Sequence, residues 1–382
     1  MRHACSILLL ATACTLQSGC LAGFVADRLI APTNGGDLAG VVPLEGPGIF
    51  NGGGSLAVGP PESPATIVYW VMEPGPFAAE AVPVGEPRTD LDDVPAAADR
   101  GQGQRWVVVR ASHPQLDHDL VLRRPVADAG PQPLGARGAA ATVFLLQGWG
   151  SRQRTLPYLW HVAGWLADAG CRVILPDLRA QGDSSGAHLT FGMHERHDLA
   201  ALATHLRAAG LLEGPLGVVG HSYGGATAIQ WAATDPRVAR ILALSPYADG
   251  ETTGDTVRNL LREKSGVLAL LLRPLLTDAF FERVGVRIGE KIGSGPDDGS
   301  PIASLRQIDT PLLLVHGSDD RNVPVRNASR LRDARPAGTT FWRIDGAAHY
   351  DYLFTHQRGL HERLDAWVAA LRSADRGPEA PP

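Results

Sequence analysis

The sequence predicts an α/β fold with a mostly parallel, doubly wound sheet, and two observations support this prediction. Apolar runs of strand length, each bounded by Gly, Pro or Asp, recur at residues 142–146, 172–175, 216–219, 241–244, 312–315 and 340–344. Continuous apolar runs of this length are what a parallel sheet covered on both faces requires. Stretches with helix-compatible composition alternate with them, at residues 160–169, 195–209, 226–234, 325–332 and 360–371. Strand and helix in alternation are typical of doubly wound sheets.

Bulk composition excludes several classes of protein. The chain has 382 residues, 44% hydrophobic and 20% charged, which is typical of a globular protein and not of a disordered one. Its formal net charge of -5 comes from 35 basic and 40 acidic residues that are dispersed along the chain, without a basic run. A phosphate backbone would need such a run, so we expect no nucleic-acid partner.

The N-terminus has the features of a bacterial export signal. A basic start at Arg2 precedes an apolar stretch over residues 7–16, which is too short to span a bilayer. Ser18-Gly19-Cys20 then resembles a lipobox, although Gln17 stands where a lipobox usually has Leu. We therefore expect a signal peptide over residues 1–19 and a lipid on Cys20, which would anchor the protein on the periplasmic side of the cell envelope. The alternative is an ordinary cleaved signal and a secreted protein.

The remaining chain divides by composition. We expect a Gly/Pro-rich tether over 20–64, an α/β domain over 65–372 and a disordered tail over 373–382. Short runs at 67–72, 106–110 and 120–123 predict opening, partly antiparallel strands. A long connection at 250–304 contains apolar stretches, and connections of that length are rarely structureless. It predicts a helical insertion that caps the site; the alternative is a helix pair packed on the sheet.

A candidate nucleophile follows the third of the apolar runs. The order is strand (216–219), then Gly220-His221-Ser222-Tyr223-Gly224-Gly225, then a helix-prone stretch from Ala226. In a nucleophile elbow the serine occupies a strained turn, and small residues two places on either side let the backbone approach closely. The helix that follows points its first amides at the site and favours negative charge there. Ser222 is the predicted nucleophile.

A serine hydroxyl needs a base, and the base needs a carboxylate to orient it. After the strand at 312–315 come His316-Gly317-Ser318-Asp319-Asp320, with Val323-Pro324 close behind, and His349 lies in a small-residue loop after the strand at 340–344. This order resembles the α/β-hydrolase superfamily, whose acid often holds the fifth place of a pattern such as H-G-x-x-D-x-x-V-P. The resemblance covers about residues 140–372. It implies Asp320 as the acid and His349 as the general base, with Asp319 and Asp249 as alternatives for the acid.

The same resemblance implies two backbone donors for the substrate's oxyanion. One is the amide of Tyr223, and the other comes from the loop Gln147-Gly148-Trp149-Gly150, where we assign it to Trp149. The family usually has His-Gly at the start of this loop, so Gln147 is a departure. Gln181 likewise replaces a histidine of the family pattern D-x-R-G-H-G-x-S, in a loop that we interpret as scaffolding.

Together these features predict a serine hydrolase that cleaves a carboxylic ester of a small uncharged acyl substrate through an acyl-enzyme. The alternatives are an envelope-tethered peptidase or amidase of the same fold and a catalytically silent binding protein. His188, His194 and His197 lack a clean ligand set, and no nucleotide-binding glycine pattern stands out. We expect no metal and no cofactor.

Overall fold

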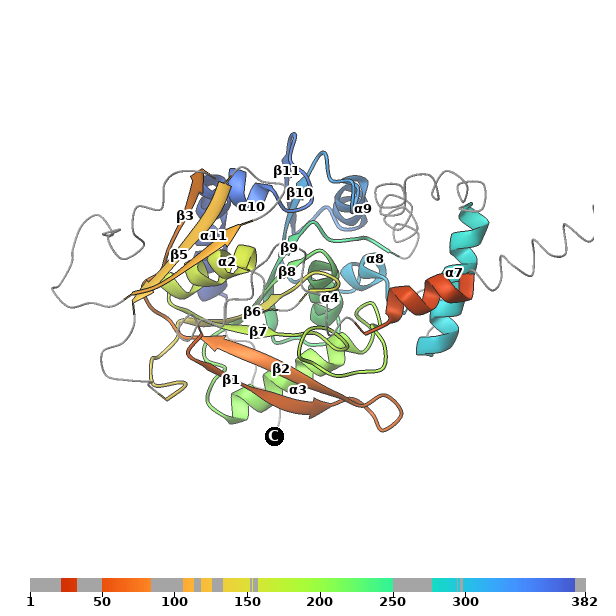
Figure 1. The fold of residues 1–382 in the computed structure, drawn as a ribbon, viewed down its shortest axis with the longest axis horizontal. Coiled ribbons are helices and arrows are strands. Elements are labelled where there is room, and N and C mark those ends of the chain that lie inside the picture. The colour runs from red at the N-terminus through yellow and green to blue at the C-terminus, as the bar shows by residue number, and fades with distance from the viewer. Residues whose placement is uncertain are drawn as a thin grey trace, which may run out of the picture.

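The central feature of the fold is an eight-stranded sheet. The structure is a computed structural model that describes residues 22–32, 50–83, 106–112, 118–125, 133–151, 153, 157–249, 277–293, 295 and 298–374. The sheet has the order β1-β2-β7-β6-β8-β9-β10-β11 (Figure 1). Its strands are β1 (Gly52–Val58), β2 (Ala65–Met72), β6 (Ala141–Leu146), β7 (Cys171–Pro176), β8 (Leu216–His221), β9 (Val238–Leu244), β10 (Leu312–Gly317) and β11 (Thr339–Ile344).

The neighbouring strands β7, β6, β8, β9, β10 and β11 all pair in parallel. In contrast, β1 pairs antiparallel with β2, and β2 pairs antiparallel with β7. All six runs that were predicted as parallel strands are in this set. The doubly wound sheet predicted from the sequence is confirmed.

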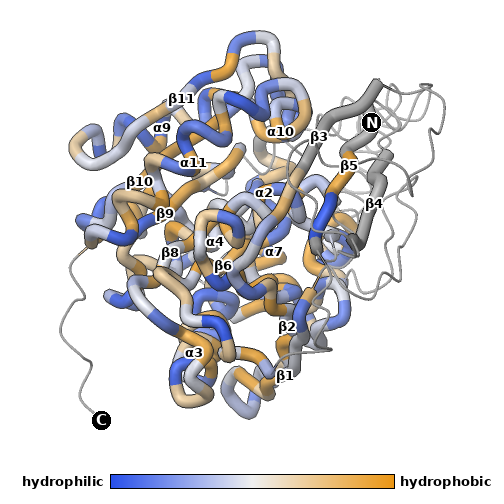
Figure 2. The backbone as a smooth tube through the Cα atoms, turned by 90° about the vertical axis from the view of Figure 1, so that its left-hand side faces the viewer, coloured by the Kyte–Doolittle hydropathy of each residue, from blue (hydrophilic) through white to orange (hydrophobic). Residues whose placement is uncertain are grey.

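Helices cover both faces of the sheet. On one face lie α3 (Glu195–Ala208) and α4 (Tyr223–Ala232), and on the other α2 (Pro157–Asp168) and α11 (Gln357–Arg372). Alternate residues of β6 serve the two faces: Phe144 packs with the first helix pair and Val143 with the second, and both are fully buried. Figure 2 shows hydrophilic and hydrophobic residues mixed along α3, as expected for a helix with one face on a core.

A second, smaller sheet is antiparallel and contains β3 (Ala78–Pro83), β5 (His118–Pro125) and β4 (Trp106–Ser112) in that order. The runs at 106–110 and 120–123 therefore do not share a sheet with the run at 67–72. The reason is that β1 and β7 already occupy both edges of β2. Strand composition predicted the strands and not their partners.

The prediction of a tether over residues 20–64 is wrong at both ends of that segment. Residues 22–30 form a helix whose Ala22 and Ala26 pack against Phe280 and Val284. At the other end, the glycine-rich segment is β1, where a side chain at Gly53 would lie 2.3 Å from the Tyr69 carbonyl oxygen. These glycines permit close strand pairing, so their abundance did not indicate a flexible linker.

The long insertion at 250–304 is helical where the structure describes it. It contains α7 (Asp278–Ile292), which lies beside the helix of residues 22–30 at one side of the molecule (Figure 1), and α8 (Pro301–Leu305), which packs on α4. Residues 250–276 lie outside the described part. The remaining helices are α9 (Arg326–Ala334) and α10 (Tyr352–Thr355). No helix among the described residues has the length and apolar character needed to cross a membrane.

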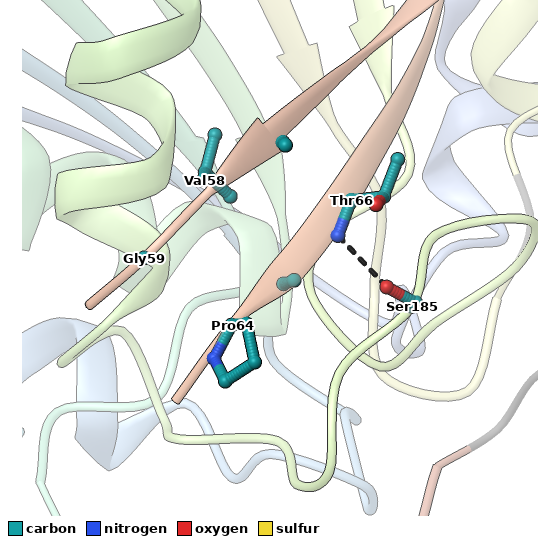
Figure 3. A pocket seen from close by; sticks show the side chains of 7 residues that line it. Val58, Gly59, Pro64, Thr66 and Ser185 are labelled. Atoms are coloured by element: carbon teal, nitrogen blue, oxygen red, sulfur yellow. Dashed lines mark hydrogen bonds between the residues drawn. The ribbon is translucent and has the colours of Figure 1, made fainter. Parts of the chain in front are cut away.

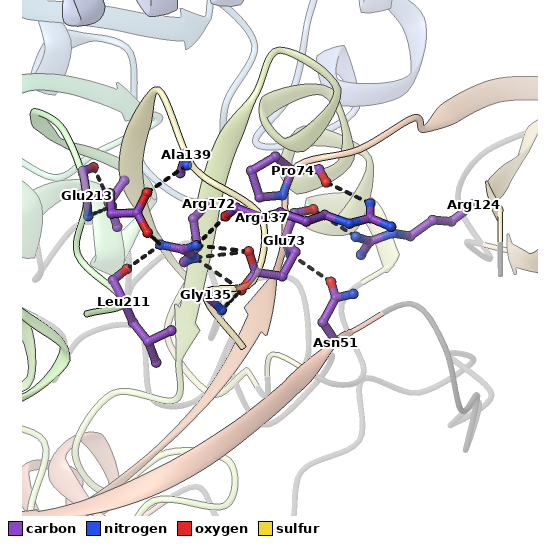
Figure 4. Close-up of polar contacts among 11 residues, drawn as sticks. Asn51, Glu73, Pro74, Arg124, Gly135, Arg137, Ala139, Arg172, Leu211 and Glu213 are labelled. Carbon is purple, nitrogen blue, oxygen red and sulfur yellow. Dashed lines mark hydrogen bonds and ion pairs between the residues drawn. The ribbon is translucent and has the colours of Figure 1, made fainter. Parts of the chain in front are cut away.

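One buried arginine joins the end of β2 to the segments that precede β6 and β8. The Arg172 side chain in β7 is fully buried, and its Nε donates to both carboxylate oxygens of Glu73 at 3.1 Å (Figure 4). Nη1 reaches the Leu211 carbonyl and Glu213, and Nη2 donates to the Arg137 carbonyl at 2.7 Å. Three segments that are distant in sequence thus converge on one guanidinium, whose burial needs these partners.

We predict that Arg172→Met lowers the free energy of unfolding by about 3–5 kcal/mol, because the buried Glu73 carboxylate loses its charge partner. Urea denaturation of the purified chain measures the change. The control is Arg358→Met, which breaks an ion pair with Glu362 whose side chains are 94% and 61% exposed, and it should change stability by no more than about 0.5 kcal/mol. Similar losses for both variants would contradict a structural role for the buried network.

Candidate active site

Ser222 sits on a strained turn between β8 and α4. Its φ is 53° and its ψ is -112°, outside the regions that non-glycine residues favour. The Ser222 amide donates to the Leu244 carbonyl of β9 at 2.7 Å, which holds the turn against the neighbouring strand. The side chain stands half-buried at the end of the sheet where the parallel strands terminate. Strain of this kind persists only where the surroundings enforce it.

The glycines around Ser222 are required by close backbone approach. A side chain at Gly224 would lie 2.5 Å from the Leu146 carbonyl oxygen and 2.6 Å from that of Gln147. One at Gly220 would lie 2.3 Å from the carbonyl oxygen of Gly224. The end of β6, the turn and the start of α4 therefore pack backbone to backbone. This packing explains the spacing of the motif.

Asp320 and His349 form a hydrogen-bonded pair. His349 Nδ1 lies 2.7 Å from Asp320 Oδ2, while Asp320 Oδ1 accepts from the Val323 amide at 2.8 Å. Burial alone would raise the pKa of Asp320, but the positive charge that His349 can carry, together with hydrogen bonds from His316 and His349, holds that pKa well below its ordinary value. An ionised carboxylate only accepts, so His349 Nδ1 carries the proton. Neutral His349 then has a free lone pair on Nε2.

The other two candidate acids lie elsewhere. Asp319 is exposed, and its carboxylate accepts from the Ser318 hydroxyl at 2.8 Å. Asp249 follows β9 and forms an ion pair with Arg330 of α9. The structure thus brings Asp320 to His349, in agreement with the position in the motif.

His221 connects the nucleophile turn to the His349 loop. Its ring lies 4.9 Å from the His349 ring, centroid to centroid, and its Nε2 is 3.3 Å from the His349 carbonyl oxygen. Burial, together with the charge of His349, lowers the pKa of His221 to about 3. Among the described residues the Ser222 hydroxyl forms no hydrogen bond with His349. Such bonds are often long before substrate binds.

The two proposed oxyanion donors flank Ser222. Tyr223 is the first residue of α4, so its amide has no acceptor inside the helix. On the other side, a side chain at Gly148 would come within 3.6 Å of Ser222 Cβ, which places the loop after β6 directly beside the nucleophile. Trp149 follows in that loop with 41% of its surface exposed.

A buried carboxylate fixes the side chain of Tyr223. The Tyr223 hydroxyl donates to Glu195 Oε1 at 2.7 Å and accepts from the Phe191 amide at 2.8 Å. Burial and the charge of Glu195 raise the pKa of Tyr223 well above its ordinary value, so the hydroxyl keeps its proton. The residue that would provide one oxyanion amide is thereby held at both its backbone and its side chain.

Both glutamines that depart from the family pattern are buried and bind backbone. The Gln147 amide, oriented to satisfy its neighbours, donates to the Pro176 carbonyl and accepts from the Leu178 amide, each at 2.8 Å. Gln181 Oε1 accepts from the Gly150 amide at 2.9 Å. They join the loop after β6 to the loop after β7 and so support the predicted scaffolding role.

Sequence reasoning missed His221 and Ser245, which both contact the His349 carbonyl. Ser245 Oγ lies 3.0 Å from that oxygen, and Ser245 has a left-handed φ of 49°. His221 stands inside the motif beside Ser222 and could have been singled out by that position. Ser245 follows β9 without any local signal.

A surface hollow at the ends of β1 and β2 is a separate feature (Figure 3). Its lining residues are Ala57, Val58, Gly59, Pro64, Ala65, Thr66 and Ser185, and none of the catalytic candidates is among them. Cys20, the predicted lipidation site, lies outside the described residues. Within the described residues, no three His, Cys, Asp or Glu side chains are grouped to hold a metal ion.

Two known proteins are similar to this chain in sequence. In sequence, the chain is 26% identical over 205 residues to the uncharacterized protein YqkD of Bacillus subtilis, covering 52% of this chain and 63% of that protein. It is 30% identical over 208 residues to the magnesium-chelatase 30 kDa subunit of Rhodobacter capsulatus, covering 46% and 70%. The match to the first relative thus spans less than two thirds of its length.

In structure, an esterase of Pyrococcus furiosus superposes with a TM-score of 0.55 at 16% identity, over 91% of this chain and 99% of that one, which shows a shared fold. The model of the alpha/beta hydrolase family matches residues 143–363, which include the nucleophile turn, Asp320 and His349. The chain belongs to the alpha/beta hydrolase family.

Proposed function

We propose that this hydrolase cleaves carboxylic esters, with Ser222 as nucleophile, His349 as general base and Asp320 as the orienting acid. The observation that carries the proposal is the strained serine beside a loop that holds a His349–Asp320 pair at 2.7 Å. Serine is too weak a nucleophile at neutral pH without such a pair. A turn that served only structure would need neither the strain nor the pair.

The reaction follows from these positions. His349 Nε2 accepts the proton as Ser222 Oγ attacks the ester carbonyl, and the ionised Asp320 stabilises the imidazolium that forms. The tetrahedral oxyanion accepts from the Trp149 and Tyr223 amides, each worth about 3 kcal/mol in the transition state. His349 then returns the proton to the leaving alcohol. Water attacks the acyl-enzyme by the same route and releases the acid.

Aromatic rings beside the site favour an uncharged acyl group. Tyr158 and Tyr350 stack with ring centroids 5.7 Å apart, and the Tyr158 ring lies edge-on to His221 at 6.0 Å. Trp149 presents an exposed ring in the adjoining loop. An exposed aromatic ring beside the nucleophile can bind an apolar group by burial of its surface, and the buried Tyr158 ring packs behind the site.

We predict that Ser222→Ala lowers kcat for short p-nitrophenyl esters by at least about 1,000-fold, because it removes the attacking oxygen. Asp320→Asn should lose activity severely as well, since an amide cannot stabilise the imidazolium. The matched control is Asp319→Asn, one residue away and exposed, which should retain the wild-type rate within about threefold. Equal rates for wild type and Ser222→Ala would refute the assignment.

We expect the ester rate to fall as pH drops, because a base that has taken up a proton cannot accept the one from Ser222. The carboxylate of Asp320 stays ionised because its pKa lies well below the ordinary value, and burial lowers the pKa of His221 to about 3, so neither of these groups accounts for a fall near neutral pH. Rate profiles from pH 4 to 9 test this. A rate that does not change from pH 5 to 8 would contradict a histidine base.

For location, we propose export and a lipid on Cys20. The helix of residues 22–30 docks on α7, and the Leu189 amide donates to the Ile30 carbonyl at 3.0 Å. Only two peptide units separate Cys20 from Ala22, a reach of at most about 8 Å. A lipid on Cys20 would therefore hold the α7 side of the domain close to the membrane.

This arrangement predicts different lipid contact on two sides of the molecule. The full chain, extracted from bacterial membranes and reconstituted in phosphatidylethanolamine and phosphatidylglycerol vesicles, would carry a fluorophore at Val286→Cys in α7 or at Arg358→Cys in α11, both exposed positions. Spin-labelled lipid should quench the first at least threefold more than the second, and mass spectrometry should find acylated Cys20. An unmodified Cys20 or equal quenching would overturn the proposal.

A further inference from the structure

The main-chain carbonyl of His349 is held by two buried side chains from different strands. His221, at the end of β8, places Nε2 at 3.3 Å from this oxygen, and Ser245, after β9, places Oγ at 3.0 Å. Both residues are at most 3% exposed. A carbonyl oxygen only accepts, so both side chains donate to it.

These donor roles determine which atom carries each hydrogen in the contacts that link His221, Ser245 and Tyr352 to the His349 carbonyl. The His221 ring is neutral with its hydrogen on Nε2, because its pKa is lowered to about 3 by burial first and by His349 second. The Ser245 hydroxyl has one hydrogen and gives it to the His349 carbonyl. Tyr352, whose hydroxyl lies 3.0 Å from Ser245 Oγ, must then donate to Ser245. Burial raises the pKa of Tyr352, so it keeps the proton that this requires.

Ser245 has an unfavourable backbone conformation at this contact. Its φ is 49°, and its amide donates to the Val315 carbonyl of β10 at 2.8 Å. Non-glycine residues rarely adopt this region, and those that do cluster at functional sites. Its hydroxyl contacts Tyr352 and the loop after β11 that carries His349, which we call the base loop.

The rest of the base loop is tied to the β10 side. The Gly346 amide donates to Ser318 Oγ at 2.8 Å, and the Ala347 carbonyl accepts from the Asp319 amide at 2.9 Å. These contacts fix the loop relative to Asp320. Among these groups, only the His349 carbonyl is held by residues at the ends of β8 and β9, namely His221 and Ser245.

We propose that His221 and Ser245 are positioning residues that clamp the His349 carbonyl and thereby set the distance between the catalytic base and Ser222. The proposal rests on the proposed function. The Asp320 hydrogen bond orients the ring of His349, and the clamp places its Cα. A displacement of about 1 Å in a catalytic group can lower the rate 100-fold, so two donors on one carbonyl have a direct effect on turnover.

Two substitutions at His221 separate donation from packing. Glutamine places an N–H where Nε2 lies and restores the donor, whereas phenylalanine keeps the ring and loses the donor. We expect His221→Phe to lower kcat 10- to 100-fold with KM changed less than threefold, and His221→Gln to remain within about threefold of wild type. A Phe variant as active as the Gln variant, or a Gln variant as impaired as the Phe variant, would overturn the clamp.

Ser245→Ala provides the second arm, with Ser185→Ala as its matched control. Both remove a serine hydroxyl that binds backbone, and Ser185 lies in the surface hollow, where its Oγ accepts from the Thr66 amide. We expect about a tenfold loss of kcat for Ser245→Ala and none for Ser185→Ala. Because both donors hold one oxygen, the double variant His221→Phe/Ser245→Ala should deviate at least threefold from the product of the single losses. Independent losses would overturn the joint clamp.

Proton NMR of the full chain provides a measurement that does not depend on turnover. The hydrogen on His349 Nδ1, bonded to Asp320, should give a downfield resonance that keeps its shift in His221→Gln and moves or broadens in His221→Phe. An unchanged resonance in the Phe variant would overturn the clamp even if no ester is hydrolysed. Equal ester rates for wild type and Ser222→Ala would instead refute the proposed function alone.

Discussion

The backbone contact between the end of β6 and the start of α4 is the constraint on which the site depends. Gly224 lies so close to the Leu146 and Gln147 carbonyls that no side chain fits there. This approach forces the chain through a tight turn and leaves Ser222 at φ 53°. The same contact brings the Gly148 loop beside Ser222 and points the start of α4 at the same place. One packing requirement therefore positions the nucleophile and both proposed oxyanion donors.

The second half of the site is assembled at the same edge of the sheet. Active-site residues of open α/β sheets gather beyond the carboxyl ends of the strands, because parallel strands end side by side there. Asp320 follows β10 and His349 follows β11, and β10 pairs with both β9 and β11. The base is thus fixed to its acid by adjacent strands. Its relation to Ser222 depends on contacts that cross the sheet, which gives the His221 and Ser245 donors their importance.

Buried polar side chains hold the loops around the site in place through hydrogen bonds. Glu195 accepts a hydrogen bond from the Tyr223 hydroxyl, Gln147 and Gln181 bind backbone of neighbouring loops, and Arg172 of β7 binds Glu73 at the end of β2. Each of these contacts joins segments that are distant in sequence and gives a buried polar atom a partner, which offsets part of the cost of its desolvation. The glutamines at positions 147 and 181, which depart from the family pattern, both bind backbone.

The sequence by itself determined the six parallel strands and the elbow, because these depend on local periodicity and on glycine spacing. It also placed Asp320 and His349 through the order of motif and strands. It could not show which of Asp320, Asp319 and Asp249 meets His349, since all three lie near strand ends and only the hydrogen bond at 2.7 Å distinguishes them. It misassigned the segment after Cys20 as a tether because packing of Ala22 and Ala26 on α7 needs a partner some 250 residues away. Only the tertiary structure revealed the contacts on the His349 carbonyl, since that acceptor is backbone and has no residue signature.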